Sequence, residues 1–244
     1  MTETEVSRPA PVAGQDGAGQ EIVLHDYWRS SAAYRVRIAM GIKGLSWRTV
    51  PVDLVAGEQR GARHMALNPQ GLVPALEIDG LVLTQSLAML EYLEQTRPGP
   101  ALLPPAAGER ARVRAIALAI ACDIHPLSNL AVLNRVERLG GAEARADWNR
   151  ANIGSGLQVV ERLLDHPGFT GRFCHGDSPG LADCTLIPQL YNATRWGVDF
   201  NGLGRISAVA RACADVPAFV AAHPDRAAAA AAGSQSPDPA AGDR

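Results

Sequence analysis

The stretch HDYWRSSAAYRVRIAMGIKG, residues 25–44, decides how this chain begins to fold. An apolar, strand-like run, EIVLHDY (21–27), leads into it, and apolar residues at helical spacing follow in two rows. Two apolar rows indicate a helix that is buried on two sides, and Gly44 is a plausible stop for that helix. Ser30 and Ser31 lie where the strand gives way to the helix, so either serine could cap its first turn.

The apolar runs that follow complete one α/β unit. Strands are predicted for WRTVPVDL (47–54), LVPALEID (72–79) and LVLT (81–84), and a helix for SLAMLEYLEQT (86–96). The order is β-α-β followed by β-β-α. A crossover helix makes the first two strands parallel, whereas Gly80 turns the last two into a hairpin. This is the element order of a thioredoxin-like domain, which we place at residues 21–98.

The remainder of the chain differs in composition. The proline-rich stretch RPGPALLPPAAGE favours a linker at residues 99–109. Residues 110–226 carry apolar side chains three and four positions apart with no convincing strand, which predicts an all-helical bundle. Residues 1–20 and the Ala/Pro/Gly-rich tail, 227–244, are predicted to be disordered. The alanine run of that tail could extend a helix, which Gly233 and two prolines would end.

Composition narrows the class of function. The 244 residues carry 23 basic and 25 acidic side chains, so neither nucleic acid nor an acidic membrane is an expected partner. No apolar run approaches the roughly 18–20 residues that span a bilayer, and residues 1–21 lack the regions of a secretory signal. The cysteines contain no CxxC pair, so we expect no metal site or disulfide framework but reduced thiols in a cytoplasmic protein. They are Cys122, Cys174, Cys184 and Cys213.

The two serines of the opening stretch could bind a ligand. A helix start presents free N–H groups and a partial positive charge, and both stabilise a thiolate. No cysteine is close to Ser30 or Ser31 in the sequence, so such a thiol would have to arrive on a ligand. Taken alone, a serine at a helix start is most often a simple cap.

Two further motifs could each have either a purely structural role or a role in binding a ligand. A cis peptide at Val73-Pro74 would turn the Val73 backbone toward a peptide-like ligand, although base rates favour a trans proline that opens an edge strand. Gln85 and Ser86 precede a helix, where Ser86 could act only as a cap or could donate to a bound carboxylate.

Together and in this order, these motifs resemble the glutathione transferase superfamily. Within it, WRSSAAYRVRIA (28–39) resembles the zeta-class signature, whose usual form is Ser-Ser-Cys-x-x-Arg-Val-Arg-Ile-Ala. The likeness covers residues 22–224 and continues through ALNPQGLVPALEIDG, QSLAMLEYLE, RPGPALLP, IHPLSNLAVL and LADCTLIPQLYNATRWGVD.

The resemblance implies a thioredoxin-like domain joined to an all-helical domain, a homodimer, and glutathione as cofactor. It also implies cis–trans isomerisation of maleylacetoacetate, a step of tyrosine and phenylalanine catabolism. In that reaction the glutathione thiolate adds to a double bond, allows rotation and leaves again.

The same resemblance assigns roles to individual positions. Ser30 matches the hydroxyl that faces the glutathione sulfur, with Ser31 and the helix start assisting it. Arg29 and Arg195 match basic residues that hold substrate carboxylates. The positions that match residues holding the tripeptide are Gln59, Gln70, the Val73 backbone, Gln85, Ser86, Asp123, His125 and Asn129.

The chain departs from the family pattern at two positions. Ala32 stands where the signature has cysteine, which removes a protein thiol but leaves isomerisation to the sulfur of the ligand. Gly180 stands where Ser or Thr is usual, and Asp183 is expected to bond the helix start as a folding element. Arg35 and Arg37 we interpret as helix-surface or ion-pair residues.

Other functions remain open. Isomerisation of maleylpyruvate, in the gentisate pathway, is the closest, but some bacterial members with that activity carry an arginine where this chain has Leu130 and Ala131. A glutathione transferase or dehalogenase acting on α-halo acids would use the same thiolate. A non-enzymatic module of this fold is expected to lose the thiol-activating hydroxyls, which this chain keeps.

Overall fold

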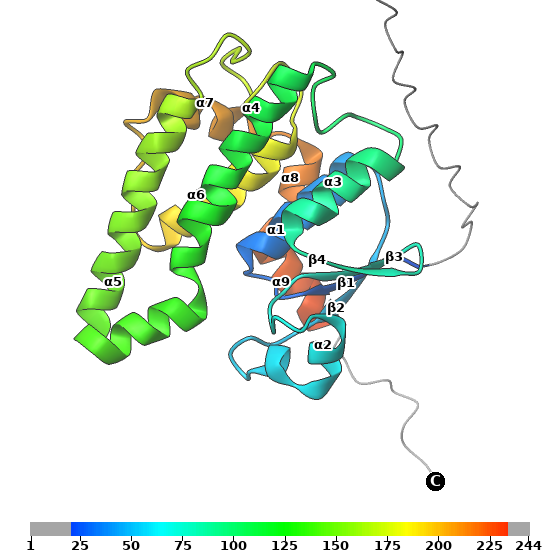
Figure 1. The fold of residues 1–244 in the computed structure, drawn as a ribbon, viewed down its shortest axis with the longest axis vertical. Coiled ribbons are helices and arrows are strands. Elements are labelled where there is room, and N and C mark those ends of the chain that lie inside the picture. Colours follow the sequence, from blue (N-terminus) through cyan, green and yellow to red (C-terminus); the bar gives the residue numbers. More distant parts are fainter. Residues whose placement is uncertain (1–20, 234–244) are drawn as a thin grey trace, which may run out of the picture.

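Two domains lie side by side in the computed structural model, which describes residues 21–233 (Figure 1). The first is a small α/β unit and the second is built from helices, as the sequence predicts. The predicted disorder of residues 1–20 and 234–244 lies outside the described residues.

A four-stranded sheet forms the first domain. In space its strands follow the order β2-β1-β3-β4. β1 and β2 are parallel and β3 and β4 form an antiparallel hairpin, which confirms both expectations. Because β3 is an inner strand, the alternative in which Pro74 opens an edge strand is wrong. The strands are β1 (Val23–Asp26), β2 (Arg48–Pro51), β3 (Ala75–Ile78) and β4 (Leu81–Thr84).

Helices cover both faces of this sheet. α1 (Ser31–Ile42) and α3 (Ser86–Thr96) pack against each other on one side, and α2 (Ala62–Leu67) lies on the other (Figure 1). The short 3₁₀ helix η1 (Glu58–Arg60) precedes α2. Gly44 follows α1 with a φ of 68°, a left-handed conformation that glycine adopts without strain, so the predicted helix stop is confirmed.

The second domain is entirely helical among the described residues, as predicted. α4 begins at Ala107, so the linker ends three residues before the predicted boundary at 109/110. α5 bends at Gly141, whose φ of 84° and ψ of 179° interrupt the helix. The elements are α4 (Ala107–Leu118), the π-helix η2 (Ala119–Ile124), the 3₁₀ helix η3 (His125–Ser128), α5 (Leu130–Leu163), α6 (Leu181–Arg195), α7 (Gly204–Ala214), α8 (Pro217–Ala222) and α9 (Pro224–Gly233).

The C-terminal tail departs from the prediction of disorder from residue 227. Its alanine run belongs to α9, which ends at Gly233. Alanine has the highest helix propensity, and Pro224 at the start of α9 lacks only an N–H that a first turn leaves unpaired. The alternative reading, a helix ended by Gly233, is therefore the correct one for residues 227–233.

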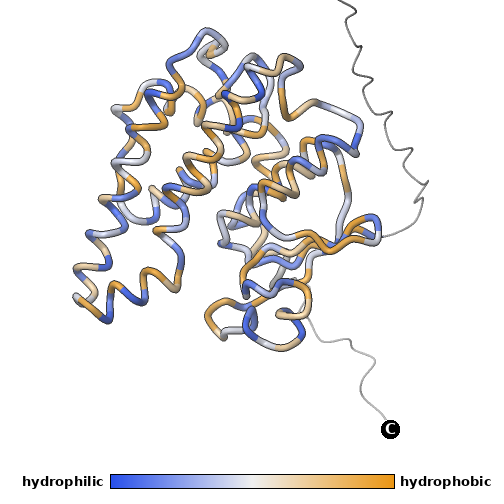
Figure 2. Tube along the Cα trace, viewed as in Figure 1, coloured by the Kyte–Doolittle hydropathy of each residue, from blue (hydrophilic) through white to orange (hydrophobic). Residues whose placement is uncertain are grey.

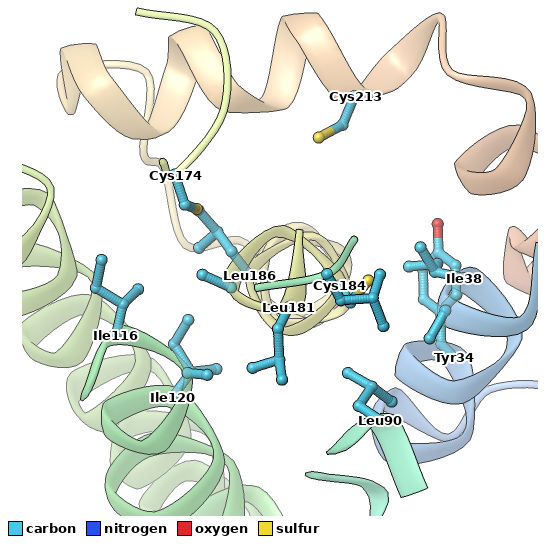
Figure 3. Close-up of a cluster of buried hydrophobic side chains, with 14 of the residues drawn as sticks. Tyr34, Ile38, Leu90, Ile116, Ile120, Cys174, Leu181, Cys184, Leu186 and Cys213 are labelled. Carbon is cyan, nitrogen blue, oxygen red and sulfur yellow. The ribbon is translucent and has the colours of Figure 1, made fainter. Parts of the chain in front are cut away.

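Helix α6 is the centre of the core. Figure 3 looks along α6, with α1 on one side, α4 and η2 on the other, and α7 above. Leu181, Cys184 and Leu186 of α6 are each at most 2% exposed. One cluster of buried hydrophobic side chains includes residues of both domains, and apolar positions alternate with polar ones along the helices (Figure 2). The two domains therefore share one core through the contact of α1 with α6.

Arg37 lies in this core, so the interpretation of it as a helix-surface residue is wrong and the ion-pair alternative is correct. Its Nη1 donates to both carboxylate oxygens of Asp26, at 2.8 and 2.6 Å. Its other nitrogens donate to the carbonyl oxygens of Trp28, at 3.0 Å, and Ala222, at 3.1 Å. One buried guanidinium thus connects β1, the loop after it and the end of α8.

Asp183 caps α6, as the sequence predicts. Its carboxylate accepts hydrogen bonds from the backbone N–H groups of Gly180 and Cys174, both at 2.8 Å. A Cβ at position 180 would approach the carbonyl oxygen of Leu102 to 2.8 Å, which explains why glycine replaces the usual Ser or Thr. Asp183 is therefore a folding element that ties the start of α6 to the preceding loop.

We expect Asp183 to make stability depend on pH. Burial raises its pKa to about 6, above the ordinary value of 3.8. A raised pKa in the folded state stabilises the protein at low pH, and this contribution is lost as the pH rises through about 6. Relative to Asp183→Asn, the wild type should gain on the order of 3 kcal/mol between about pH 7 and about pH 4, measured by urea unfolding. The expectation would be contradicted if the difference in unfolding free energy between the wild type and Asp183→Asn were the same at every pH. It would also be contradicted if the exposed control Asp215→Asn showed the same pH dependence.

The four cysteines are all free thiols. Cys174, Cys184 and Cys213 are buried and Cys122 is exposed. No group of three or more His, Cys, Asp or Glu side chains within residues 21–233 could hold a metal ion. Among those residues no single helix is long and apolar enough to cross a bilayer, and only the bent pair Ala107–Ser128 and Leu130–Leu163 meets that criterion when taken together.

Candidate active site

The start of α1 presents a hydroxyl and a helix dipole at the same point. Ser30 is the N-cap in extended conformation, and its Oγ accepts a hydrogen bond from the backbone N–H of Ala33 at 3.2 Å. The Ser30 hydroxyl proton is therefore available to another acceptor. No acidic side chain occupies the first turn to offset the positive end of the dipole. An anionic sulfur placed here would meet a hydroxyl donor and a partial positive charge.

Ser31 has a different environment. Its side chain is buried, and its hydroxyl donates to the carbonyl oxygen of Pro188 in α6 at 3.4 Å. Ser31 thus joins the two domains, whereas Ser30 is half-exposed at the helix start. The two hydroxyls differ in what they contact, although the residues are adjacent and of the same type.

A second group of predicted residues lies around the start of α3. The Val73–Pro74 peptide bond is cis and directly precedes β3. Gln85 has a φ of 67°, in the left-handed region that non-glycine residues rarely adopt. Its amide donates to the side-chain oxygen of Gln70 at 3.0 Å, so these two exposed glutamines lie together beside Ser86.

Gln59 belongs to η1, in the loop region before α2. Its side chain is buried, and its Oε1 has no hydrogen-bond partner among the described residues. A buried polar atom without a partner is uncommon in folded proteins. This orphaned oxygen fits a peptide ligand that offers an N–H group.

Arg35 connects the start of α3 to α1. Its side chain is buried rather than on the helix surface, and it forms no ion pair among residues 21–233, so neither sequence interpretation holds for it. Its Nη1 donates to Ser86 Oγ at 3.1 Å, whereas its Nε and Nη2 are buried without a partner there. Burial lowers the pKa of Arg35 to about 10, so the side chain remains positively charged at neutral pH.

The predicted residues of the helical domain lie at the end of the π-helix η2. Asp123 is exposed within it, His125 follows it directly, and Asn129 is the N-cap of α5. Burial, and secondarily the charge of Arg35, lower the pKa of His125 to about 3. His125 is therefore neutral and lies near Arg35, which brings this element to the α1–α3 side of the site; no contact places Asp123 there.

Arg29 and Arg195 form a positive cluster that has no acidic partner within residues 21–233. The guanidinium of Arg29 lies 5.1 Å from the ring centre of Trp28 and donates to the hydroxyl of Tyr27 at 3.4 Å. The guanidinium of Arg195 lies 6.0 Å from the ring centre of Tyr191. Burial and then the charge of Arg29 lower the pKa of Arg195, so the two guanidinium groups lie close enough to repel each other. Neither forms an ion pair with a carboxylate in the described part of the chain.

Sequence reasoning missed the aromatic surroundings of this cluster and the burial of Arg35. Tyr27 and Trp28 directly precede Arg29, and their adjacency was the available signal. Tyr191 gives no such signal, because it lies four residues before Arg195 on a helix whose buried face is apparent only in the fold. Its ring meets those of Tyr34 and His223 edge to face, at 6.4 and 5.4 Å.

The arrangement combines two functions at the boundary between the domains, where α1 contacts α6. The start of α1 can stabilise a sulfur anion, and two unpaired arginines on either side of the domain boundary can hold a carboxylate or a developing oxyanion. A ligand that carries both a thiol and a peptide backbone fits the first region. A small acidic substrate fits the second.

Family models match both halves of the chain. The model described as "Glutathione S-transferase, N-terminal domain" matches residues 29–96, and the one described as "Glutathione S-transferase, C-terminal domain" matches residues 133–224. Together these segments include the start of α1, the start of α3 and Arg195.

Individual relatives are similar over nearly the whole described region. The maleylacetoacetate isomerase of Rhizobium meliloti is 55% identical over 85% of this chain and 98% of its own. A crystal structure of maleylacetoacetate isomerase from Anaeromyxobacter dehalogenans, with glutathione in the active site, is 45% identical with a TM-score of 0.76, over 84% of this chain and 96% of its own. A holo structure of a zeta-class bacterial maleylpyruvate isomerase is 41% identical with a TM-score of 0.80, over 84% of this chain and 97% of its own.

Proposed function

The chain belongs to the glutathione S-transferase family, and from this membership and the site just described we propose that it is a glutathione-dependent maleylacetoacetate isomerase. The product of that reaction is fumarylacetoacetate. The observation that carries the proposal is the juxtaposition of a thiol-stabilising helix start at Ser30 with the unpaired arginines Arg29 and Arg195. We further propose a cytoplasmic homodimer acting in tyrosine and phenylalanine catabolism.

Glutathione, when bound, supplies a thiolate that adds reversibly to the cis double bond of the substrate and so permits rotation about it. The residues that would hold the peptide are Gln59, Gln70, the Val73 backbone, Gln85, Ser86, His125 and Asn129, together with Asp123. The orphaned Gln59 Oε1 and the cationic surroundings of Ser86 fit a peptide that carries N–H and carboxylate groups.

Ser30 and the helix start have to keep the sulfur ionised at neutral pH. A free thiol has a pKa of about 8.5, so lowering it by about 2 requires about 3 kcal/mol of differential stabilisation. The start of a helix contributes about 0.3–2 kcal/mol, and a hydrogen bond to a charged group about 1.5–3 kcal/mol. The two together suffice, whereas neither alone does so comfortably.

Arg29 and Arg195 act at the other end of the substrate. Their guanidinium groups match the geometry of a carboxylate and favour negative charge that develops on the substrate carbonyl oxygen. The absence of acidic partners among the described residues leaves both cations available for this role. The flanking Trp28 and Tyr191 rings keep them oriented without neutralising them.

The decisive experiment is an isomerisation assay on maleylacetoacetate with glutathione counted before and after. We expect turnover that depends on glutathione without consuming it. A higher kcat/KM for maleylpyruvate would favour that substrate, as in the structural neighbour of that name. Consumption of glutathione or release of halide from α-halo acids, without isomerisation, would favour a transferase. Failure to bind glutathione would favour a non-enzymatic module.

Arg195→Met should raise KM for maleylacetoacetate by roughly tenfold while leaving the affinity for glutathione unchanged, because it removes one charge-assisted contact to the substrate. Steady-state kinetics at saturating glutathione measures this. Arg211→Met, at an exposed arginine of α7, is the matched control. An unchanged KM, or an equal change in the control, would remove Arg195 from the substrate site.

The proposed homodimer is supported by apolar side chains on the surface of one chain. Leu81 and Val82 of the edge strand β4 and Leu118 of α4 are each 46% exposed. Leu81 and Val82 lie next to each other on an edge strand, which is a place where a second chain can pair. Light scattering on the purified protein tests the state directly.

A further inference from the structure

Helix α1 carries two buried arginines that differ in how completely they are paired. Arg37 is surrounded by acceptors: the Asp26 carboxylate and two carbonyl oxygens. Arg35, half a turn before it, has one partner, Ser86 Oγ, and two buried nitrogens that have none among the described residues. It is 2% exposed, so solvent does not replace the missing partners.

A buried guanidinium without a counterion is a costly arrangement. It persists in folded proteins chiefly where it serves something other than stability. Neutral His125, which lies nearby, cannot supply negative charge. The positive charge of Arg35 is therefore not balanced by any negative charge among the described residues.

The hydrogen bond between Arg35 and Ser86 fixes the direction of the serine hydroxyl. A guanidinium only donates, so Ser86 Oγ must be the acceptor. The single hydroxyl proton of Ser86 is then free to donate to a third group. Ser86 is also the first residue of α3, an eleven-residue helix whose free N–H groups favour an anion at the same place.

We propose that Arg35 is a positioning residue for the glutathione carboxylate at the start of α3. Arg35 holds Ser86 so that its proton points to the α-carboxylate of the γ-glutamyl group, and this carboxylate provides the negative charge that Arg35 lacks. The inference rests on the proposed function in one respect, namely that glutathione binds at this site.

The proposal makes opposite predictions for the free and the bound protein. Arg35→Met removes an uncompensated buried charge while keeping a long apolar side chain, so the ligand-free protein should melt at the same temperature as the wild type or higher. Glutathione should bind roughly tenfold or more weakly to the variant, the loss typical of a charge-assisted contact. An arginine that served only the fold would lower the melting temperature.

The experiment compares two ligands by calorimetry: glutathione, and the analogue whose γ-glutamyl α-carboxylate is replaced by hydrogen. The wild type should prefer glutathione by roughly tenfold or more, whereas Arg35→Met should bind the two with nearly equal affinity. Arg35→Lys, which keeps the charge but not the fork of donors, should recover part of the preference. The melting temperature of each ligand-free protein is measured in parallel.

Two results would overturn the inference: an undiminished preference for glutathione in Arg35→Met, or a ligand-free Arg35→Met that melts well below the wild type. Failure of the proposed function is distinguishable from both. A wild type that discriminates between the two ligands but does not isomerise maleylacetoacetate would refute the reaction and support the role of Arg35.

Discussion

Replacing Ser30 with alanine should lower kcat for glutathione-dependent isomerisation by roughly ten- to a hundredfold and raise the pKa of the bound glutathione thiol by about 1 to 2. Of the two serine hydroxyls at the start of α1, that of Ser30 keeps its proton free of any acceptor within residues 21–233, whereas that of Ser31 donates to Pro188. Its removal leaves only the helix start, which by itself contributes about 0.3–2 kcal/mol toward ionising the sulfur. Thiolate absorbance against pH measures the pKa, and steady-state rates measure kcat.

The neighbouring serine provides the matched control. Ser31 donates to the Pro188 carbonyl across the domain boundary, through a long hydrogen bond of 3.4 Å. Ser31→Ala should therefore cost stability of about 1 kcal/mol and leave the thiol pKa close to its wild-type value. If the two variants raised the thiol pKa equally and slightly, the helix start would be sufficient without either hydroxyl.

The second large effect is expected for stability. Arg37→Leu should lower the free energy of unfolding by about 3–5 kcal/mol, because it leaves the buried Asp26 carboxylate without its partner. The side chains of Arg37 and Asp26 are 4% and 3% exposed, so water cannot replace the lost contact. The carbonyl groups of Trp28 and Ala222 lose their donor in the same variant. Urea denaturation with a two-state fit measures the change.

The control for this prediction is an ion pair of the same type at the surface. Arg48 and Glu21 also form a pair, at 2.8 Å, but their side chains are 52% and 58% exposed. Arg48→Leu should change stability by less than about 1 kcal/mol, because solvent screens such pairs. The double variant Asp26→Leu with Arg37→Leu should recover much of the lost stability, since replacing both charges leaves nothing unpaired. A small effect of Arg37→Leu would show that Asp26 finds another partner.

The contrast between Arg35 and Arg37 bears on how this family site is built. Arg37 pairs with a carboxylate, whereas Arg35 keeps two nitrogens without a partner among the described residues, beside the helix start where we propose that glutathione binds. Proteins commonly accept unfavourable local arrangements where they bind or react. The stability measurements on the two variants should therefore be compared. Arg37→Leu should lose stability, whereas ligand-free Arg35→Met should lose none.

The order of strands and helices in the first domain followed from the sequence alone. Apolar spacing and turn residues such as Gly44 and Gly80 act over a few positions, so they predict elements and stops without knowledge of the fold. The short motifs around Ser30, Val73 and Ser86 left capping and binding both open on local grounds, and the prediction of a site there came from their resemblance to the glutathione transferase pattern. The end of α9 at Gly233 was open to local reasoning, because the alanine run and its flanking proline and glycine are local signals.

Only the tertiary structure decided which charged residues lie inside and what they contact. Arg35 meets Ser86 across 51 positions of sequence, and Arg37 meets the carbonyl of Ala222 across 185. Periodicity shows which face of a helix is apolar, but it does not show which element covers the charged positions of that helix. Ser30 and Ser31 are adjacent and chemically identical, yet the packing of α6 against α1 engages one hydroxyl and leaves the other free. The physical reason is that burial and hydrogen-bond partners are properties of assembled surfaces, which no local stretch of the chain encodes by itself.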